Sequence, residues 1–302
     1  MLELTKQNHV KWGYNGLPYN QETLKDKTPA FYNIEFGKSQ SEILPWRDEC
    51  INAARYIKET TKLPIMLSMS GGIDSEVAFH SLRLAGADFT AVICKFENNY
   101  NIDDCNLAVE LCKQYNIEYQ LIEISIAKYL HDNCLAFGEK YKTTNCRLMF
   151  HLLLIEMFPD SYIIFAGGDL YLFKNTQRSA SMQVMFRGNS TLVAQKFVEL
   201  NQPSCPWFFL YTPEMILSFL EHPLTKIFIQ HSTSMKMQGI TDFKPAIYSY
   251  SWPEIDRARP KYNGFENLQQ LDQYYSEKLK EKYQYWDEPI FKFVDEVIAE
   301  LK

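Results

Sequence analysis

The sequence predicts an α/β fold in which helices cover both faces of a twisted parallel sheet, with a mainly helical C-terminal region after it. Short apolar runs, typical of buried strands, occupy residues 63–68, 89–96, 118–124 and 162–166. Apolar residues at helical spacing lie in the intervals, at residues 77–86, 103–115 and 146–158. Strands that alternate with helices pair in parallel, because a helix carries the chain back across one face of the sheet.

We expect the domain that contains this sheet to cover residues 46–200. Residues 1–45 are polar and aromatic with turn signals, and we interpret them as an extended lead-in. Residues 201–302 are rich in aromatic residues and are interpreted as a separate, mainly helical region. Helical spacing predicts further helices at residues 46–60, 214–220 and 268–281.

The composition is that of an ordinary globular protein and argues against several functional classes. Of the 302 residues, 46% are hydrophobic and 23% are charged, values that fit neither a disordered nor a fibrous chain. The net charge of -6 argues against nucleic acid as a partner of the whole surface, although a local basic patch stays open. No run approaches the roughly 18 apolar residues of a membrane helix, and no apolar signal core is seen, so we expect no membrane partner.

The seven cysteines favour a reducing compartment, and we therefore expect a cytoplasmic protein. Their number is odd, and no two of them have the Cys-x-x-Cys spacing of a zinc or redox site. Cys94, Cys105 and Cys112 lie in apolar-periodic stretches and are interpreted as small core residues. We interpret Cys146 and Cys205 as buried structural thiols, with a catalytic role as the open alternative.

The segment after the first predicted strand of the sheet has the chemistry of an anion-binding loop. It reads Ser68-Met69-Ser70-Gly71-Gly72-Ile73-Asp74-Ser75. The glycines let backbone N–H groups approach an anion, the serines add hydroxyl donors, and the next helix turns its N-terminus to the same place. A carboxylate such as Asp74 makes sense there as a ligand of Mg²⁺ that bridges phosphates.

The run from Ser70 to Ser75 resembles the PP-loop, Ser-Gly-Gly-x-Asp-Ser, of the N-type ATP pyrophosphatase superfamily. Its members include asparagine synthetase, argininosuccinate synthetase, NAD synthetase, GMP synthetase, tRNA-lysidine synthetase and several tRNA thiolases. The Walker pattern Gly-x-x-x-x-Gly-Lys-Ser/Thr is absent. The resemblance implies an adenine nucleotide alpha hydrolase-like fold of the HUP type, with ATP and Mg²⁺ as cofactors. It also implies that ATP is cleaved between the α- and β-phosphates. The loop residues from Ser68 to Ser75, Ile73 included, would then bind the nucleotide.

Two further segments are assigned through the same resemblance. The segment after the second strand, which begins Lys95-Phe96, is expected to lie against adenine. The run Gly167-Gly168-Asp169 resembles the Gly-x-Gly-x-Asp-Glu-Leu-Phe stretch of asparagine synthetases, which implies nucleotide contacts and makes Asp169 a second metal ligand beside Asp74. Leu170 replaces the acid that follows in that family, so one carboxylate is missing here.

Cations must offset the charge of the triphosphate, and the loop itself carries no lysine. Arg147, at the start of a predicted helix, is one candidate for contact with the phosphates. Lys261 is the other, in the run Arg257-Ala258-Arg259-Pro260-Lys261, which resembles the late basic segment of asparagine synthetases. We expect Asp74, Arg147 and Lys261 to be the catalytic residues.

The sequence therefore predicts an adenylating ligase or amidotransferase that forms AMP and pyrophosphate, similar to the synthetase domain of asparagine synthetase. An N-terminal cysteine nucleophile is absent, since the chain begins Met1-Leu2, so ammonia, an amine or a separate nitrogen donor would supply nitrogen. Residues 201–302 would form the acceptor pocket or a lid, with the acceptor itself unidentified. Three alternatives stay open: a nucleic-acid-modifying or sulfur-transfer enzyme with the same loop, a sulfonucleotide reductase-like protein, and a degenerate nucleotide-binding protein.

Overall fold

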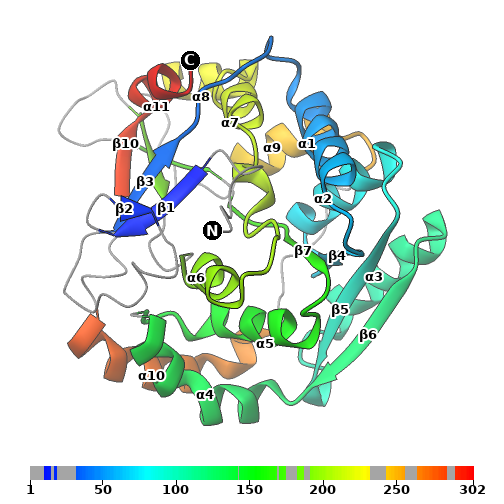
Figure 1. The fold of residues 1–302 in the computed structure, drawn as a ribbon, viewed down its shortest axis with the longest axis vertical. Coiled ribbons are helices and arrows are strands. Elements are labelled where there is room, and N and C mark those ends of the chain that lie inside the picture. Colours follow the sequence, from blue (N-terminus) through cyan, green and yellow to red (C-terminus); the bar gives the residue numbers. More distant parts are fainter. Residues whose placement is uncertain are drawn as a thin grey trace.

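The computed structural model contains a four-stranded parallel sheet, on the right-hand side of Figure 1, which confirms the predicted fold class. In spatial order β6-β5-β4-β7, its strands are Tyr119–Ile124, Phe89–Phe96, Ile65–Ser68 and Tyr162–Phe165. Ser68 at the end of β4 is level with Val92 of β5 and with Phe165 of β7. The chain passes from β4 to β5 and then to β6 on one side of β4, and it returns to form β7 on the other side. The strand order therefore reverses between β4 and β7, and this is the switch point of the sheet. Ligands of such sheets bind at the carboxyl ends of the strands beside this point.

The structure describes ten ranges of the chain, and every structural statement below concerns these residues. They are residues 10–14, 17–18, 32–141, 143–168, 170–174, 182–186, 191–231, 243–255, 264–283 and 290–302.

Helices connect the parallel strands as predicted, with one addition. The crossovers from β4 to β5 and from β5 to β6 contain α2 and α3, and the return to β7 contains α4 and α5. Because such crossovers are right-handed as a rule, the two pairs of helices are expected on opposite faces of the sheet. The helix α4 was not predicted, and the predicted helix at residues 146–158 begins as a 3₁₀ turn, Cys146–Met149. The helices of this part are α1 (Trp46–Thr60), α2 (Ile73–Leu84), α3 (Ile102–Tyr115), α4 (Ile126–Tyr141) and α5 (Phe150–Met157).

The later part of the described chain is mainly helical, which confirms the second part of the predicted fold class. Its helices are α6 (Thr191–Leu200), α7 (Pro213–Leu220), α8 (Pro223–His231), α9 (Phe243–Ser251), α10 (Gln269–Tyr283) and α11 (Val294–Leu301). The start of α7 shows how local chemistry sets a boundary, since the Thr212 hydroxyl accepts a hydrogen bond from Met215 N at 3.2 Å and Pro213 occupies the first helical position. Within the described ranges, no helix has both the length and the apolar character needed to cross a bilayer.

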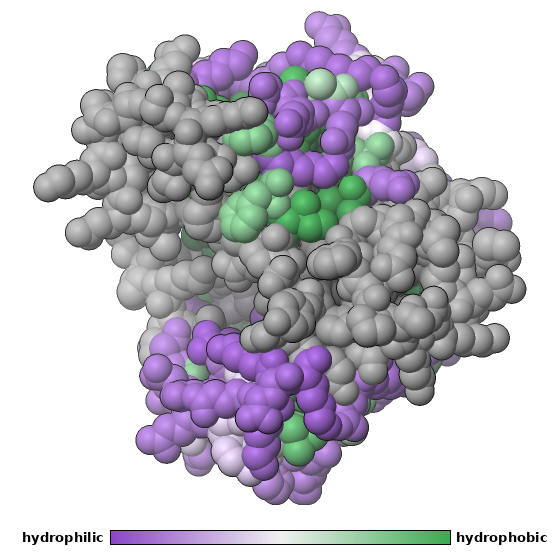
Figure 2. Space-filling view, turned by 90° about the vertical axis from the view of Figure 1, so that its left-hand side faces the viewer, coloured by the Kyte–Doolittle hydropathy of each residue, from purple (hydrophilic) through white to green (hydrophobic). Residues whose placement is uncertain are grey.

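Two small antiparallel sheets complete the described structure. Strands β1 (Val10–Tyr14), β2 (Leu17–Pro18) and β3 (Tyr32–Phe36) form the first within the predicted lead-in. Strands β8 (Tyr171–Lys174), β9 (Met182–Phe186) and β10 (Ile290–Phe293) form the second, in which the C-terminal part of the chain pairs with its middle. The blue strand β3 lies beside the red strand β10 in Figure 1, and Nζ of Lys292 in β10 is 5.2 Å from the centre of the Phe36 ring in β3. On the face shown in Figure 2, hydrophilic residues gather at the top and bottom with a smaller hydrophobic area between them.

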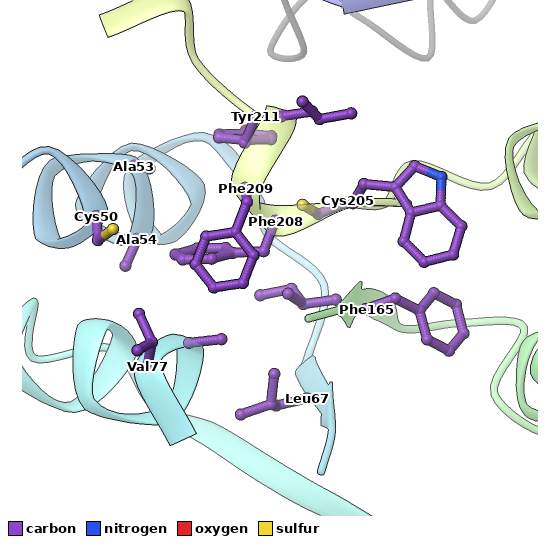
Figure 3. Close-up of a cluster of buried hydrophobic side chains, with 14 of the residues drawn as sticks. Cys50, Ala53, Ala54, Leu67, Val77, Phe165, Cys205, Phe208, Phe209 and Tyr211 are labelled. Atoms are coloured by element: carbon purple, nitrogen blue, oxygen red, sulfur yellow. The ribbon is translucent and has the colours of Figure 1, made fainter. Parts of the chain in front are cut away.

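One hydrophobic core joins the parallel sheet to residues beyond position 200. Figure 3 shows Leu67 of β4 and Phe165 of β7 beneath Phe208 and Phe209, with α1 alongside. The ring of Trp46 at the start of α1 is stacked on Phe209, with 5.9 Å between the ring centroids. Residues on the two sides of the predicted boundary near 200 therefore share their apolar contacts.

Leu67 and Leu121 lie in strands of the same sheet and provide a matched test of this core. Leu67 in β4 is fully buried, whereas Leu121 in the edge strand β6 is 47% exposed. We expect Leu67→Ala to lower the free energy of unfolding by about 2–5 kcal/mol, because the change leaves a cavity in the core. Leu121→Ala should lower it by less than about 1 kcal/mol. Urea denaturation measures both, and equal losses would contradict the central position of β4.

Candidate functional site

The predicted anion-binding loop lies at the carboxyl end of β4, beside the switch point of the sheet. Met69 N donates a hydrogen bond to Val92 O at 2.9 Å, which keeps the first residue after β4 attached to β5. Gly72 is the N-cap of α2, and the helix begins at Ile73. The first-turn N–H groups of α2 have no partner within the helix, so the loop and the helix N-terminus together form a positive end suited to an anion.

Two serines give the loop its shape. The Ser75 hydroxyl donates to Gly72 O at 2.8 Å and accepts from Ser70 N at 3.3 Å, and the two serine Oγ atoms are 3.2 Å apart. The Ser70 hydroxyl also accepts from Gly72 N at 3.3 Å. Ser75 is buried while Ser70 is exposed. Ser75 therefore supports the loop from inside, and the Ser70 hydroxyl is the one that a ligand can reach.

Gly71 lies where the loop touches the next helix of the domain. Its φ is +80°, and a Cβ at this position would lie 2.1 Å from the backbone oxygen of Asp104 in α3. Asn101, just before α3, fixes this corner: its side chain donates to Cys94 O and accepts from Phe96 N, both at 2.8 Å. The shape of the loop therefore depends on how β5 leads into α3.

Asp74 forms an ion pair that the sequence did not predict. Nζ of Lys244 lies 2.6 Å from Asp74 Oδ1 and 2.7 Å from Oδ2. Asp74 is in the first turn of α2 and Lys244 in the first turn of α9, 170 residues later. The side chains are 23% and 12% exposed, respectively. The requirement for a cation could be stated from the sequence, but no pattern around Phe243-Lys244-Pro245 distinguishes this lysine from the others.

The structure places the predicted cations and the second carboxylate as follows. Nε of Arg147 donates to Asp272 Oδ2 of α10 at 2.7 Å, so among the described residues its ion pair is with α10 and not with the loop. Lys261 and Asp169 lie outside the described residues. The contacts of all three with phosphate or metal stay predictions.

The segment predicted to lie against adenine is firmly held at the end of β5. Nζ of Lys95 is paired with Glu123 of β6 at 2.9 Å. The Phe96 ring is buried between Phe150 and Phe265, with centroid distances of 5.9 and 5.4 Å. The Phe96 N–H is bonded to Asn101, so other backbone groups of the segment would have to contact a base, and this contact stays a prediction.

The second glycine pair follows β7 and has a packing role. Gly168 has φ +80°, and a Cβ at Gly167 or Gly168 would lie 2.5 or 2.6 Å from Trp207. Phe209 N donates to Gly167 O at 3.1 Å. The glycines thus allow the segment around Trp207 to lie against the end of β7, and their predicted contact with a nucleotide is not tested by this packing.

Asp74 fits a magnesium ion that is brought by a nucleotide. The described residues contain no group of three or more His, Cys, Asp or Glu side chains that could hold a metal. Mg²⁺, however, is commonly bound through one or two carboxylates together with substrate phosphates and water. Glu76 does not add to this set, since it is buried in α2 with His80 Nε2 4.0 Å away.

The cysteines predicted to be structural are buried. Cys146 and Cys205 are fully buried free thiols, and burial raises the pKa of Cys205. Cys134 lies next to Cys146, and the hydrogen bond between the two thiols raises the pKa of Cys134. A reactive cysteine needs a lowered pKa and access to solvent, and Cys205 has neither.

A shallow cavity lies apart from the loop, outside the edge strand β6. It measures about 320 Å³. Its lining comes from β6, α4 and α5 and includes Ile124, Lys128, Tyr129 and Leu153. None of the lining residues belongs to the loop or to α9, so the cavity is separate from the Asp74 site.

Comparison with known proteins gives structural matches alone. No protein-family profile and no curated sequence matches this chain. The NH3-dependent NAD synthetase of Campylobacter jejuni, in complex with the nitrate ion, matches with 18% identity and a TM-score of 0.34, over 80% of this chain and 94% of its own. The NMN synthetase of Francisella tularensis matches with 16% identity and a TM-score of 0.34, over 77% and 92%. The glutamine-dependent NAD+ synthetase of Acinetobacter baumannii, in complex with ADP, matches with 13% identity and a TM-score of 0.33, over 82% and 48%.

Gly71 and Gly72 are neighbours with opposite steric demands, which makes them a matched pair. We expect Gly71→Ala to lower the free energy of unfolding by about 1–3 kcal/mol, because alanine is strained at positive φ and its Cβ meets the backbone of Asp104. At Gly72, φ is -81° and a Cβ would be 3.4 Å from Ser70 Oγ, an ordinary contact. Gly72→Ala should therefore leave the stability nearly unchanged. Chemical denaturation tests this, and equal stability of the two variants would contradict the packing of the loop on α3.

His151 predicts a dependence of stability on pH. Its ring packs on Phe150 and Phe165 with centroid distances of 4.1 and 4.6 Å, and desolvation lowers its pKa to about 4. Between that value and the unfolded pKa of about 6.5, the unfolded chain binds the proton and the folded protein does not, so stability falls as the pH is lowered through this window. We expect His151→Phe to flatten the slope between pH 6.5 and pH 4 in denaturation curves. An unchanged slope would show that His151 does not cause it.

Proposed function

We propose that this protein is an ATP-dependent adenylating enzyme, a ligase or amidotransferase that forms AMP and pyrophosphate. The observation that carries the proposal is the complete loop from Ser70 to Ser75 at the carboxyl end of β4, with the N-terminus of α2 and the Asp74 carboxylate beside it. A helix N-terminus together with glycine N–H groups is a general solution for binding phosphate. The position beside the switch point of a parallel sheet supports the same reading.

In the proposed reaction an oxygen of the acceptor attacks the α-phosphorus of ATP. The new oxygen–phosphorus bond forms as the bond from the α-phosphorus to the bridging oxygen breaks, and pyrophosphate leaves with that electron pair. A nitrogen nucleophile, from ammonia, an amine or a separate donor, then displaces AMP from the adenylated acceptor. The protein contributes mainly position and charge: the N–H groups of the loop and the Ser70 hydroxyl hold the pyrophosphate part in place.

Asp74 would hold Mg²⁺, which when bound neutralises phosphate charge, and Asp169 remains the proposed second metal ligand. Arg147 and Lys261 remain proposed phosphate contacts, and Lys244 joins them because it already lies beside Asp74. Gly167, Gly168, Asp169, Lys95 and Phe96 remain proposed nucleotide contacts. No observation favours the sulfur-transfer alternative, since both cysteines considered for it are buried. A cytoplasmic location also remains part of the proposal.

Asp74→Asn is the central test of this function. We expect the variant to lose adenylation activity almost completely while its unfolding transition stays cooperative, because the change removes a charge and little volume. Asp103→Asn, which alters an exposed aspartate in the first turn of α3, is the matched control and should keep wild-type activity. The assay is exchange of labelled pyrophosphate into ATP, screened across amino acids, nucleotides and tRNA, with AMP and pyrophosphate identified as products. Formation of ADP and phosphate in their place would overturn the proposal.

A further inference from the structure

The ion pair between Lys244 and Asp74 gives the loop a cation of its own. We propose that Lys244 is paired with the Asp74 carboxylate in the nucleotide-free protein and is displaced by metal-bound nucleotide, so that Asp74 binds a divalent cation more tightly together with ATP than alone. This inference rests on the proposed function, because it assigns a role in the same site. It concerns the order in which charges enter the site, which the loop motif does not specify.

The geometry shows that the carboxylate faces the ammonium group, which donates its hydrogen bond to Oδ2. Both oxygens of Asp74 lie within 2.7 Å of Nζ of Lys244. The lysine side chain is 12% exposed, so this pair is less screened by solvent than an ordinary surface pair. Separating Lys244 from Asp74 therefore costs more free energy than separating an exposed ion pair between flexible side chains.

Lys244 also contacts Tyr248, a residue of the same helix that is packed in the hydrophobic core. Its Nζ lies 5.3 Å from the centre of the Tyr248 ring. Tyr248 is buried, with its ring 4.7 Å from Trp46 and 5.7 Å from Phe209. The ammonium group therefore approaches the loop from a helix that is part of the main core.

The far end of α9 is anchored as well. Trp252 N donates to Tyr248 O at 2.7 Å, and the guanidinium of Arg47 in α1 lies over the Trp252 ring at 5.1 Å. Arg47 is also paired with Glu254 at 2.7 Å. With α9 attached to α1 in this way, displacement of Lys244 requires movement of its side chain and not of the helix, so the ammonium stays close to the loop after it leaves Asp74.

Competition between the lysine and a divalent cation follows from electrostatics. A carboxylate whose oxygens both face an ammonium is a poorer metal ligand, and two cations at one carboxylate repel each other. A metal ion alone must overcome this with one carboxylate and water. Nucleotide phosphates change the balance in two ways, because they provide further oxygen ligands for the metal and a second anion for Lys244.

The test measures Mn²⁺ binding without nucleotide, by electron paramagnetic resonance, in wild type and variants. We expect Lys244→Met to bind Mn²⁺ alone about tenfold more tightly than wild type, which corresponds to about 1.4 kcal/mol. Lys244→Arg keeps the charge and should stay within about twofold of wild type. Lys226→Met removes an exposed lysine from the adjacent helix α8 and controls for net charge, so it should also stay within about twofold. Adding Asp74→Asn to Lys244→Met should abolish the gain.

The outcomes separate this inference from the proposed function. Unchanged or weaker binding of Mn²⁺ by Lys244→Met would overturn the role of Lys244, even if wild type binds Mn²⁺ with a non-hydrolysable ATP analogue. Failure of wild type to bind that analogue with Mn²⁺ would instead overturn the proposed function. If Lys244→Met shows no cooperative thermal unfolding, Lys244→Gln replaces it, with the same tenfold gain expected and the same result counting against the proposal.

Discussion

The pairing of β4 with strands on both of its sides is the constraint on which the candidate site depends. Ser68 is level with Val92 and Phe165, so the turns that follow β4 and β7 leave the sheet at the same edge. The hydrogen bond from Met69 to Val92 extends the pairing one residue further before the chain turns into α2. A shift of one residue would turn the side chains of β4 to the opposite faces of the sheet and separate Leu67 from its present neighbours in the core. The position of the loop is therefore set by the same contacts that stabilise the domain.

Strands β5 and β7 could be predicted because most of their residues are buried, which produces continuous apolar runs. β5 was predicted with the bounds found, and β4, β6 and β7 within two residues. The antiparallel strands have no such signal, and β10 depends on pairing with β9 about a hundred residues earlier. The helix α4 was missed for a related reason: Gly138 interrupts its pattern, yet this glycine lets Leu279 of α10 pack against the helix. Helix α4 is thus supported by a contact that is distant in sequence.

In the candidate site as well, the residues that are close in sequence could be predicted and the distant one could not. The chemistry from Ser70 to Ser75 is contiguous, so its hydroxyls, glycines and carboxylate could be assigned roles from their order alone. Lys244 could not, because the ion pair joins positions 170 residues apart and α9 has no recognisable motif. Gly167 and Gly168 show a different limit. The family resemblance implied contact with a nucleotide, which stays a prediction, and the structure adds a steric reason for each glycine in Trp207.

An anion site that uses a carboxylate must also be stable when it is empty. Asp74 lies in the first turn of α2, where the helix dipole favours a negative charge, but it is three-quarters buried and would lose solvation without a partner. The ammonium group of Lys244 is that partner in the structure without a ligand. It also places a positive charge close to where phosphates would bind, in a loop that has no lysine of its own. Lys244 contacts Tyr248, and Tyr248 packs on Trp46 and Phe209. The core that joins α1 to the later helices therefore positions this charge. Within the described ranges, the ion pair between Asp74 and Lys244 therefore couples the helical region after residue 200 to the loop, so the geometry of a short motif depends on contacts from a distant part of the chain.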